Sequence, residues 1–229
     1  MKVVRWLLLI ALPVAPVVAL RCGWLDIPPR WNPWAPLDVR EPPNLLTSFK
    51  QWRLAYDPKR CAAALATSSL RYVPLPDSHP QPGCRIENAV RLQSSHVAFN
   101  ADFSATCPLA VAYALFERHG LQTAAEQVFG QLVVKVEHFG SFACRNIARS
   151  DRRSQHAGAN ALDIAGFRLR DGRRITLARD WAGDGERARF LRLVHGAACR
   201  YFNIVLGPDY NEAHRDHLHV GMGAWRLCR

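Results

Sequence analysis

The chain has 229 residues, which is enough for one sizeable domain with accessory segments. It is 49% hydrophobic and 21% charged, and this composition excludes intrinsic disorder of the whole chain. Its 30 Lys and Arg residues against 19 Asp and Glu residues give a formal net charge of +11, which favours an anionic partner such as nucleic acid, lipid head groups or a cell-wall polymer.

The first 20 residues have the pattern of an export signal. Lys2 and Arg5 form a short positive region, and Trp6–Leu20 is uncharged and almost wholly apolar. About 15 apolar residues are short for a membrane span, which needs about 20. We therefore expect a cleaved signal, with an uncleaved anchor in the inner membrane as the alternative, and a location in the periplasm or cell envelope. Lipidation of Cys22 is disfavoured because Arg21 precedes it.

The seven cysteines suit the oxidising compartment that export implies. They contain no C-x-x-C pair, so neither a cysteine zinc site nor a thioredoxin motif is indicated. Six of them can form three disulfides, with Cys22 left over, and six cysteines allow 15 pairings. Our expected pairing is Cys61–Cys84, Cys107–Cys144 and Cys199–Cys228.

The segment after the signal, residues 21–43, is rich in proline and predicts a stiff, extended tether. Its Trp31 and Trp34 could instead pack on the domain surface. From residue 44 to residue 229 the pattern is that of a globular domain. Helices are predicted over Asp57–Ala66, over Pro108–Glu117 with termination by Gly120, and over Thr123–Phe129, with a loop over Pro74–Gly83.

The second half of the domain reads mainly as strands. One helix is predicted over Glu186–Ala198, and strands are predicted over Leu132–His138, Asn160–Leu169, Arg174–Leu177, Asn203–Gly207 and His217–Met222. Helices followed by strands predict an α+β domain with a small, mainly antiparallel sheet and helices packed on one side.

Two short stretches, 154–163 and 214–220, carry most of the polar chemistry. Residues two apart in a strand share a face and lie about 6.5 Å apart, so His217 and His219 should point the same way. Ala161 and Asp163 share a face likewise, and the small alanine leaves open space beside the carboxylate. Two imidazoles and a carboxylate facing one cleft are the ligands of a catalytic zinc on the sheet, with one position left for water.

A closed structural zinc site that uses a fourth histidine is the alternative for this cluster. The other histidines lack such company and are predicted to be ordinary surface or core residues: His79, His96, His119, His138 and His195.

These residues resemble a known family. The Ser-x-His-x6-Asp and His-x-His pair resembles the zinc peptidases that include D-alanyl-D-alanine carboxypeptidases, lysostaphin-type enzymes and the penicillin-insensitive murein endopeptidase. More closely, residues 44–229 resemble the bacterial extensin-like protein C-terminal domain. The matching stretches are Cys144-Arg145-Asn146, Ser154–Phe167, Gly196–Pro208 with Asn211, His214–Val220 and Cys228.

The resemblance implies that His156, Asp163 and His219 hold Zn²⁺, with His217 beside the metal-bound water. It also implies that His214 is a further active-site histidine, as in the murein endopeptidases.

Related carboxypeptidases carry an acid three residues before the final histidine ligand, and Asp216 has this spacing. Asp216 and His219 would lie on opposite faces of a strand, so we expect His217 to be the general base and Asp216 to orient an imidazole. Ser154 is expected to support the first ligand through a hydrogen bond.

One position departs from the family pattern. The usual glycine three residues after the first histidine is replaced by Ala159, and Gly158 comes one residue early. A methyl group is tolerable there if the backbone is ordinary, but it is costly if φ is positive. The departure bears on activity more than on metal binding.

These features together predict an exported zinc peptidase that acts on amide bonds of peptidoglycan peptides. A cell-wall-binding domain that keeps the fold without catalysis is the alternative, and export disfavours nucleic acid as the partner. Residues 141–200 hold thirteen basic and six acidic side chains around His156 and Asp163. This excess predicts an electropositive substrate rim, with a solvated arginine-rich surface as the alternative.

Overall fold

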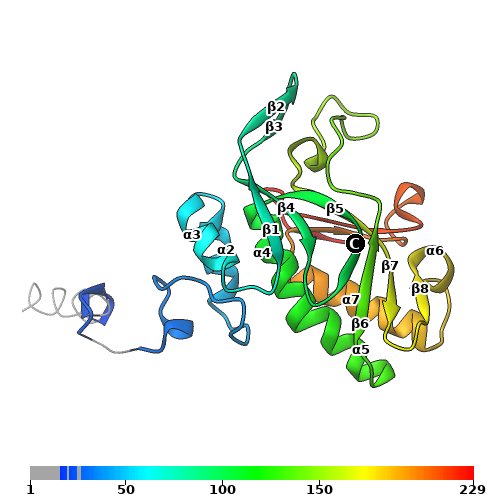
Figure 1. Ribbon diagram of the computed structural model, residues 1–229, viewed down its shortest axis with the longest axis horizontal. Coiled ribbons are helices and arrows are strands. Elements are labelled where there is room, and N and C mark those ends of the chain that lie inside the picture. Colours follow the sequence, from blue (N-terminus) through cyan, green and yellow to red (C-terminus); the bar gives the residue numbers. More distant parts are fainter. Residues whose placement is uncertain (1–15, 20, 25–26) are drawn as a thin grey trace, which may run out of the picture.

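A mixed sheet of nine strands forms the centre of the domain in the computed structural model, which describes residues 16–19, 21–24 and 27–229 (Figure 1). The strand order is β1-β4-β5-β6-β7-β10-β9-β11, and β8 pairs with β7. All neighbours are antiparallel except β5 with β6 and β9 with β11. The strands are β1 (Arg71–Leu75), β4 (Ala89–Ser94), β5 (Ala98–Thr106), β6 (Val133–His138), β7 (Ala161–Leu169), β8 (Arg174–Thr176), β9 (Ile204–Leu206), β10 (Leu218–Gly221) and β11 (Leu227–Cys228).

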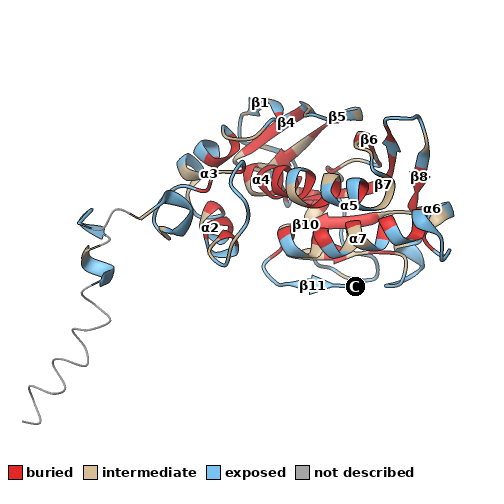
Figure 2. Cartoon of the chain, turned by 90° about the horizontal axis from the view of Figure 1, so that it is seen from below, coloured by how far each residue is buried: buried red, intermediate tan, exposed pale blue. Residues whose placement is uncertain are grey.

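Helices α4 (Cys107–Phe116), α5 (Gln122–Phe129) and α7 (Glu186–Tyr201) lie across one face of this sheet, with their buried sides against it (Figure 2). The ring of Phe167 in β7 meets that of Phe190 in α7 at 5.4 Å between centroids. A short helix, α6 (Leu177–Asp180), follows β8. The predicted α+β class with helices on one side is confirmed, and the other face of the sheet is left for polar groups.

The sheet is larger than expected because residues 71–106 contribute strands. Part of the predicted loop Pro74–Gly83 belongs to β1 and to the hairpin of β2 (Ser78–Gln81) and β3 (Cys84–Ile86), which projects from the domain (Figure 1). Prolines disfavour a strand in a sequence reading, but an edge strand tolerates them because one side of it needs no ladder hydrogen bonds. Strand β1 is at the edge of the sheet, so Pro74 fits there.

The predicted end of a helix at Gly120 is wrong. α4 runs through a π-helical turn, Glu117–Leu121, directly into α5. A Cβ at Gly120 would lie 2.8 Å from Cβ of Ala197, so the glycine allows α7 to pack closely instead of ending the helix. Gly130 does end α5, with a left-handed φ of 62°.

The proline-rich segment lies against the domain from its first 3₁₀ turn, Pro29–Trp31. It contacts α2 (Thr47–Leu54) and α3 (Pro58–Leu65). Leu37 and Val39 are buried, and the backbone N–H of Val39 donates to Oγ1 of Thr67 at 2.8 Å. Most of the predicted export signal, residues 1–15 and 20, lies outside the described residues. Along the part of the chain that the structure does describe, no helix has the length and apolarity to span a membrane.

Three disulfides join Cys61 to Cys107, Cys84 to Cys144 and Cys199 to Cys228, and Cys22 is free and exposed. The last pair was expected, but the predicted pairs Cys61–Cys84 and Cys107–Cys144 are wrong. Both errors come from joining cysteines that are near in sequence, whereas α3 packs on α4 and the hairpin reaches over to the segment that precedes His156. Three disulfides indicate an oxidising environment.

Candidate metal centre

Three side chains from two strands and a 3₁₀ turn converge on the open face of the sheet. His219 of β10 lies directly opposite Asp163 of β7 in the antiparallel register, with its Nδ1 2.9 Å from Oδ1 of Asp163. His156 lies in the 3₁₀ turn Gln155–Gly158, just before β7. Its Nε2 is 3.1 Å from Oδ1 of Asp163 and 3.0 Å from Nδ1 of His219. The three candidate ligands therefore form one compact group.

This group fits a zinc ion in spacing and in chemistry. Ligand atoms bound at about 2.0 Å around a tetrahedral zinc lie about 3.3 Å from one another, close to the observed separations. Nδ1 of His156 donates to the backbone carbonyl of Ser141 at 2.8 Å, which leaves the lone pair of Nε2 facing Asp163 and His219. Two imidazoles and one carboxylate leave a fourth position open.

The Asp163 carboxyl is held in its charged form. Burial acts to raise its pKa, but the hydrogen bonds and charges of His156 and His219 outweigh burial and hold the pKa well below its usual range. The carboxylate is therefore ready to bind a cation.

A second pair of side chains, His217 and Asp216, faces the same group. Nδ1 of His217 donates to Oδ1 of Asp216 at 2.9 Å, so Nε2 keeps its lone pair and lies 3.6 Å from Oδ1 of Asp163. His217 and His219 thus share a face as predicted, although β10 begins only at Leu218. The two ring nitrogens of His217 have different partners, which is the arrangement of a base held by a carboxylate.

His214 is the fourth imidazole of the cluster. Its ring centroid is 5.3 Å from that of His217 and 5.9 Å from that of His219, and its Nδ1 is 2.7 Å from Oδ1 of Asn211. Burial, together with the charges of His217 and His219, lowers the pKa of His214 to about 4. His214 is therefore a neutral polar group at neutral pH.

The predicted support from Ser154 acts on the backbone. Its hydroxyl oxygen accepts from the backbone N–H of His156 at 3.3 Å and caps the 3₁₀ turn. The imidazole itself is oriented by the carbonyl of Ser141, which sequence reasoning missed. A backbone carbonyl leaves no signal in a residue pattern, because every residue carries one.

Residues 59–229 match the family model described as "Extensin-like protein C-terminus". The chain belongs to this family. The match covers the cluster of six side chains as well as Ser154 and all three disulfides. The six are His156, Asp163, His214, Asp216, His217 and His219. No curated protein and no solved structure matches the chain.

The extensin-like domain strains its backbone beside the first candidate ligand. Ala159 has φ 51° and ψ 33°, the left-handed conformation that glycine adopts freely. Its N–H donates to the carbonyl of His156 at 3.1 Å, and its own carbonyl accepts from the N–H of Thr106 at 2.9 Å. Ala159 therefore meets the costly case of a positive φ, about 1–2 kcal/mol for a residue with a side chain.

Asn160 ties the same turn to the sheet, which the sequence analysis also missed. Its Oδ1 accepts from Oγ1 of Thr106 at 2.7 Å, and its Nδ2 donates to the side chain of Gln155 and to the carbonyl of Met222. These bonds join the 3₁₀ turn to the ends of β5 and β10. An amide with all these partners rigidifies the position of His156.

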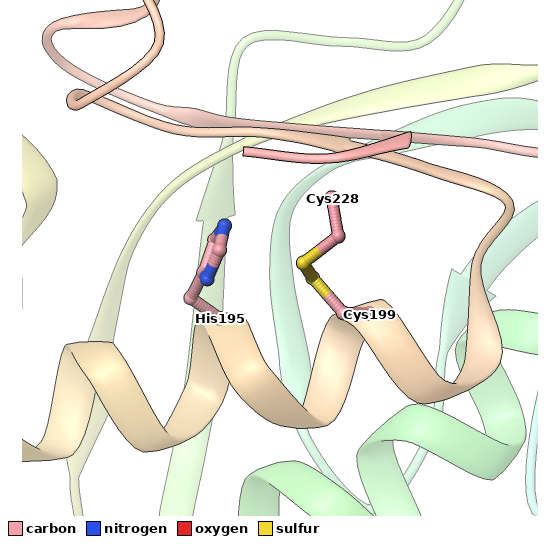
Figure 3. A group of neighbouring side chains, drawn as sticks. All are labelled: His195, Cys199 and Cys228. Atoms are coloured by element: carbon pink, nitrogen blue, oxygen red, sulfur yellow. A yellow bond between two sulfur atoms is a disulfide. The ribbon is translucent and has the colours of Figure 1, made fainter. Parts of the chain in front are cut away.

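A second group in the extensin-like domain offers metal-type donors, His195, Cys199 and Cys228 (Figure 3). The two sulfurs are bonded to each other, and Nε2 of His195 lies 3.1 Å from the carbonyl oxygen of Arg229. A disulfide offers no thiolate, so the oxidised group leaves only one imidazole for a metal. Consistent with the prediction for His195, this is a structural contact of α7 with the last strand.

Proposed function

We propose that this extensin-like domain is a zinc-dependent hydrolase that cleaves amide bonds of peptidoglycan peptides in an oxidising cell envelope. One observation carries the proposal, namely the convergence of His156, Asp163 and His219 with the His217–Asp216 pair facing them. A structural zinc site would have no use for a histidine whose free nitrogen faces the ligands while a carboxylate holds the other nitrogen.

The residues around the ligands account for the proton transfers of amide hydrolysis. When bound, zinc lowers the pKa of its water toward neutrality and polarises the scissile carbonyl. His217 accepts the proton of the attacking water at Nε2 and returns it to the leaving amine. Asp216 keeps the proton of His217 on Nδ1 and stabilises the imidazolium that forms. Neutral His214 adds a polar contact for the substrate at the mouth of the site.

Peptidoglycan as the substrate follows from the location and the charge. The predicted export signal and the three disulfides both favour an oxidising compartment as the place where the domain works. The cell wall there presents peptides with free carboxylates, and the arginine-rich surface of residues 141–200 suits such anions. The resemblance to murein-cleaving zinc peptidases agrees with this assignment.

The test is hydrolysis of purified sacculi by the full chain, produced with its disulfides formed and supplied with zinc. We expect soluble peptide products from the wild-type protein and none from His219→Ala or Asp163→Ala. Asp184→Asn is the matched control, because Asp184 is an exposed carboxylate in the loop between α6 and α7, and it should retain full activity. Sacculus binding without products at any zinc concentration would overturn the proposal.

A cell-wall-binding role without catalysis is the second candidate, and one cavity favours it. This cavity, of about 820 Å³, is lined by residues that flank His156, such as Ser154 and Asn160, but by none of the six cluster side chains. Exposed Trp52 and Tyr56 and the guanidinium of Arg200 also line it, and they offer stacking and carboxylate contacts to a polymer. Under this alternative, Asp163→Ala and the wild-type protein would bind sacculi equally and neither would release products.

A further inference from the structure

A groove of about 650 Å³ begins beside the candidate metal centre and is lined by residues of β6, β7 and β8. Ala165 lines it, two residues beyond Asp163 on the same strand, and Asp216, the partner of His217, lies at its edge. Phe139 also lines it and meets the ring of His217 edge-on at 5.7 Å between centroids. Its near end is therefore about 6.5 Å from the Asp163 backbone, the spacing of alternate residues in a strand.

The groove is lined by more cations than its own carboxylates can pair. Its four basic side chains are those of Lys135, Arg168, Arg174 and Arg179, and its two acidic side chains are those of Glu137 and Asp216. Arg174 donates to both carboxylate oxygens of Glu137, at 2.9 Å to Oε1 and 2.5 Å to Oε2. Arg168 is only 3.9 Å from the same carboxylate. The Arg174 hydrogen bond, and then the charges of Arg174, Arg168 and Lys135, lower the pKa of Glu137 against the effect of burial.

Lys135 and Arg168 lie directly opposite each other in the register of β6 and β7. Like charges in directly opposed positions of an antiparallel pair destabilise a sheet. Among the described residues, the ammonium of Lys135 makes no ion pair or hydrogen bond, because Glu137 is bound to Arg174. The pair therefore leaves a cationic position that an external anion can fill.

We infer that Lys135 and Arg168 form a subsite for a carboxylate of the substrate that lies several residues along the peptide from the bond that is cleaved, because Arg168 is five residues beyond Asp163 on β7. The inference rests on the proposed function, because it takes the metal centre as the place of cleavage. The guanidinium of Arg168 matches a carboxylate in a planar, bidentate way, and the ammonium of Lys135 adds a point charge. The subsite selects acidic peptides over neutral ones, since a neutral peptide would leave the ammonium of Lys135 unpaired and Arg168 with only its 3.9 Å contact to Glu137.

The test compares two synthetic stem pentapeptides, L-alanyl-γ-D-glutamyl-L-lysyl-D-alanyl-D-alanine with its carboxylates free or amidated. Binding to the full chain is measured by calorimetry at low salt, so the result does not require turnover. We expect the wild-type protein to bind the acid form about 10–100-fold more tightly, as two charge-assisted contacts imply. The Lys135→Ala, Arg168→Ala double variant should lose this preference, and its KM for the acid form should rise while kcat stays unchanged.

The matched control is the Arg71→Ala, Arg118→Ala double variant, which removes two exposed cations outside the groove and should keep the preference. Equal binding of both peptides, or binding of neither, by the wild-type protein overturns the inference. A preference that survives in the Lys135→Ala, Arg168→Ala variant overturns it as well. A preference for the acid form without any hydrolysis would instead sink the proposed function and leave the subsite standing.

Discussion

Nε2 of His156 lies 3.0 Å from Nδ1 of His219, although the two residues are 63 positions apart in the chain. The backbone carbonyl of Ser141 accepts a hydrogen bond from Nδ1, the only N–H of a neutral His156 ring. The lone pair of Nε2 therefore faces His219 and Asp163. The ligand atoms of His156, Asp163 and His219 come from separate segments and lie close enough together to bind one cation between them. The first prediction follows from this geometry.

We expect the purified protein to bind one zinc ion per chain, and Asp163→Asn to weaken the affinity more than about 100-fold, because the neutral amide is a poor zinc ligand. Metal analysis after dialysis and competition with a chromogenic chelator measure this. Asp184→Asn should bind zinc like the wild-type protein. Stoichiometric zinc of unchanged affinity in Asp163→Asn would show that the group is no metal centre.

The pair of His217 and Asp216 should affect turnover without affecting metal content. His217→Ala removes the proposed base and should lower kcat by about 10²–10⁴-fold, the usual contribution of a general base. Asp216→Asn should lower kcat less, because the base remains but loses the group that orients it. Zinc content is measured alongside the rate of product release from sacculi, and His79→Ala, an exposed histidine on the hairpin, is the control. Full activity in His217→Ala would rule this histidine out as the base.

Replacing Ala159 by glycine should lower the free energy of unfolding less than replacing Ala157 by glycine. Ala159→Gly relieves about 1–2 kcal/mol of left-handed strain and loses about 0.8 kcal/mol of buried methyl, so the free energy of unfolding should stay equal or rise by up to about 1 kcal/mol. Ala157→Gly, at a buried position with negative φ in the same turn, should lower it by about 1 kcal/mol. Urea denaturation distinguishes the two substitutions. A loss at Ala159 as large as that at Ala157 would contradict the strain.

The Cys84–Cys144 bond joins the β2–β3 hairpin to the segment that leads to His156. Its cysteines are 60 residues apart, so replacing both by serine should lower the free energy of unfolding by about 2–4 kcal/mol through the greater entropy of the unfolded chain. Cys22→Ser should change nothing, since Cys22 is free and exposed. Urea denaturation gives the energies, and non-reducing peptide mapping checks the pairing. A peptide that links Cys61 to Cys84 would contradict the fold.

A buried carboxyl gives the stability a dependence on pH. Burial raises the pKa of Glu117 from its ordinary 4.5 to about 7, against the effect of the hydrogen bond that it accepts from Ser95 at 2.5 Å. As the pH rises, Glu117 loses its proton at a lower pH in the unfolded chain than in the folded protein. Its contribution to the free energy of unfolding therefore falls between about pH 4.5 and about pH 7 and is constant above. At about 1.36 kcal/mol per pKa unit the loss amounts to about 3 kcal/mol.

Glu117→Gln keeps an acceptor for Ser95 and removes the titration. Relative to the wild-type protein, its free energy of unfolding should gain about 2.5 kcal/mol between pH 5 and pH 8, measured by urea denaturation. Glu126→Gln, on the exposed side of α5, is the control and should follow the wild-type protein at both values. A parallel pH profile for Glu117→Gln and the wild-type protein would show that Glu117 is charged in the folded state.

The α+β class, the family and the candidate ligands followed from the residue pattern alone, because short-range spacing carries that information. His217 and His219 are two residues apart, and the alternation of an extended chain is enough to place them on one face. The disulfide pairs, the carbonyl of Ser141 behind His156 and the opposition of Lys135 and Arg168 became known only from the fold. These relationships join segments far apart in the chain, and they depend on helix packing and strand register, which no local pattern encodes.

The departure at Ala159 needed both. The sequence places an alanine three residues after His156, and the hydrogen bonds of the 3₁₀ turn give this alanine a φ of 51°. The turn holds His156 against Asp163 and His219, so the same bonds that build the candidate centre impose the left-handed backbone on the alanine that follows it.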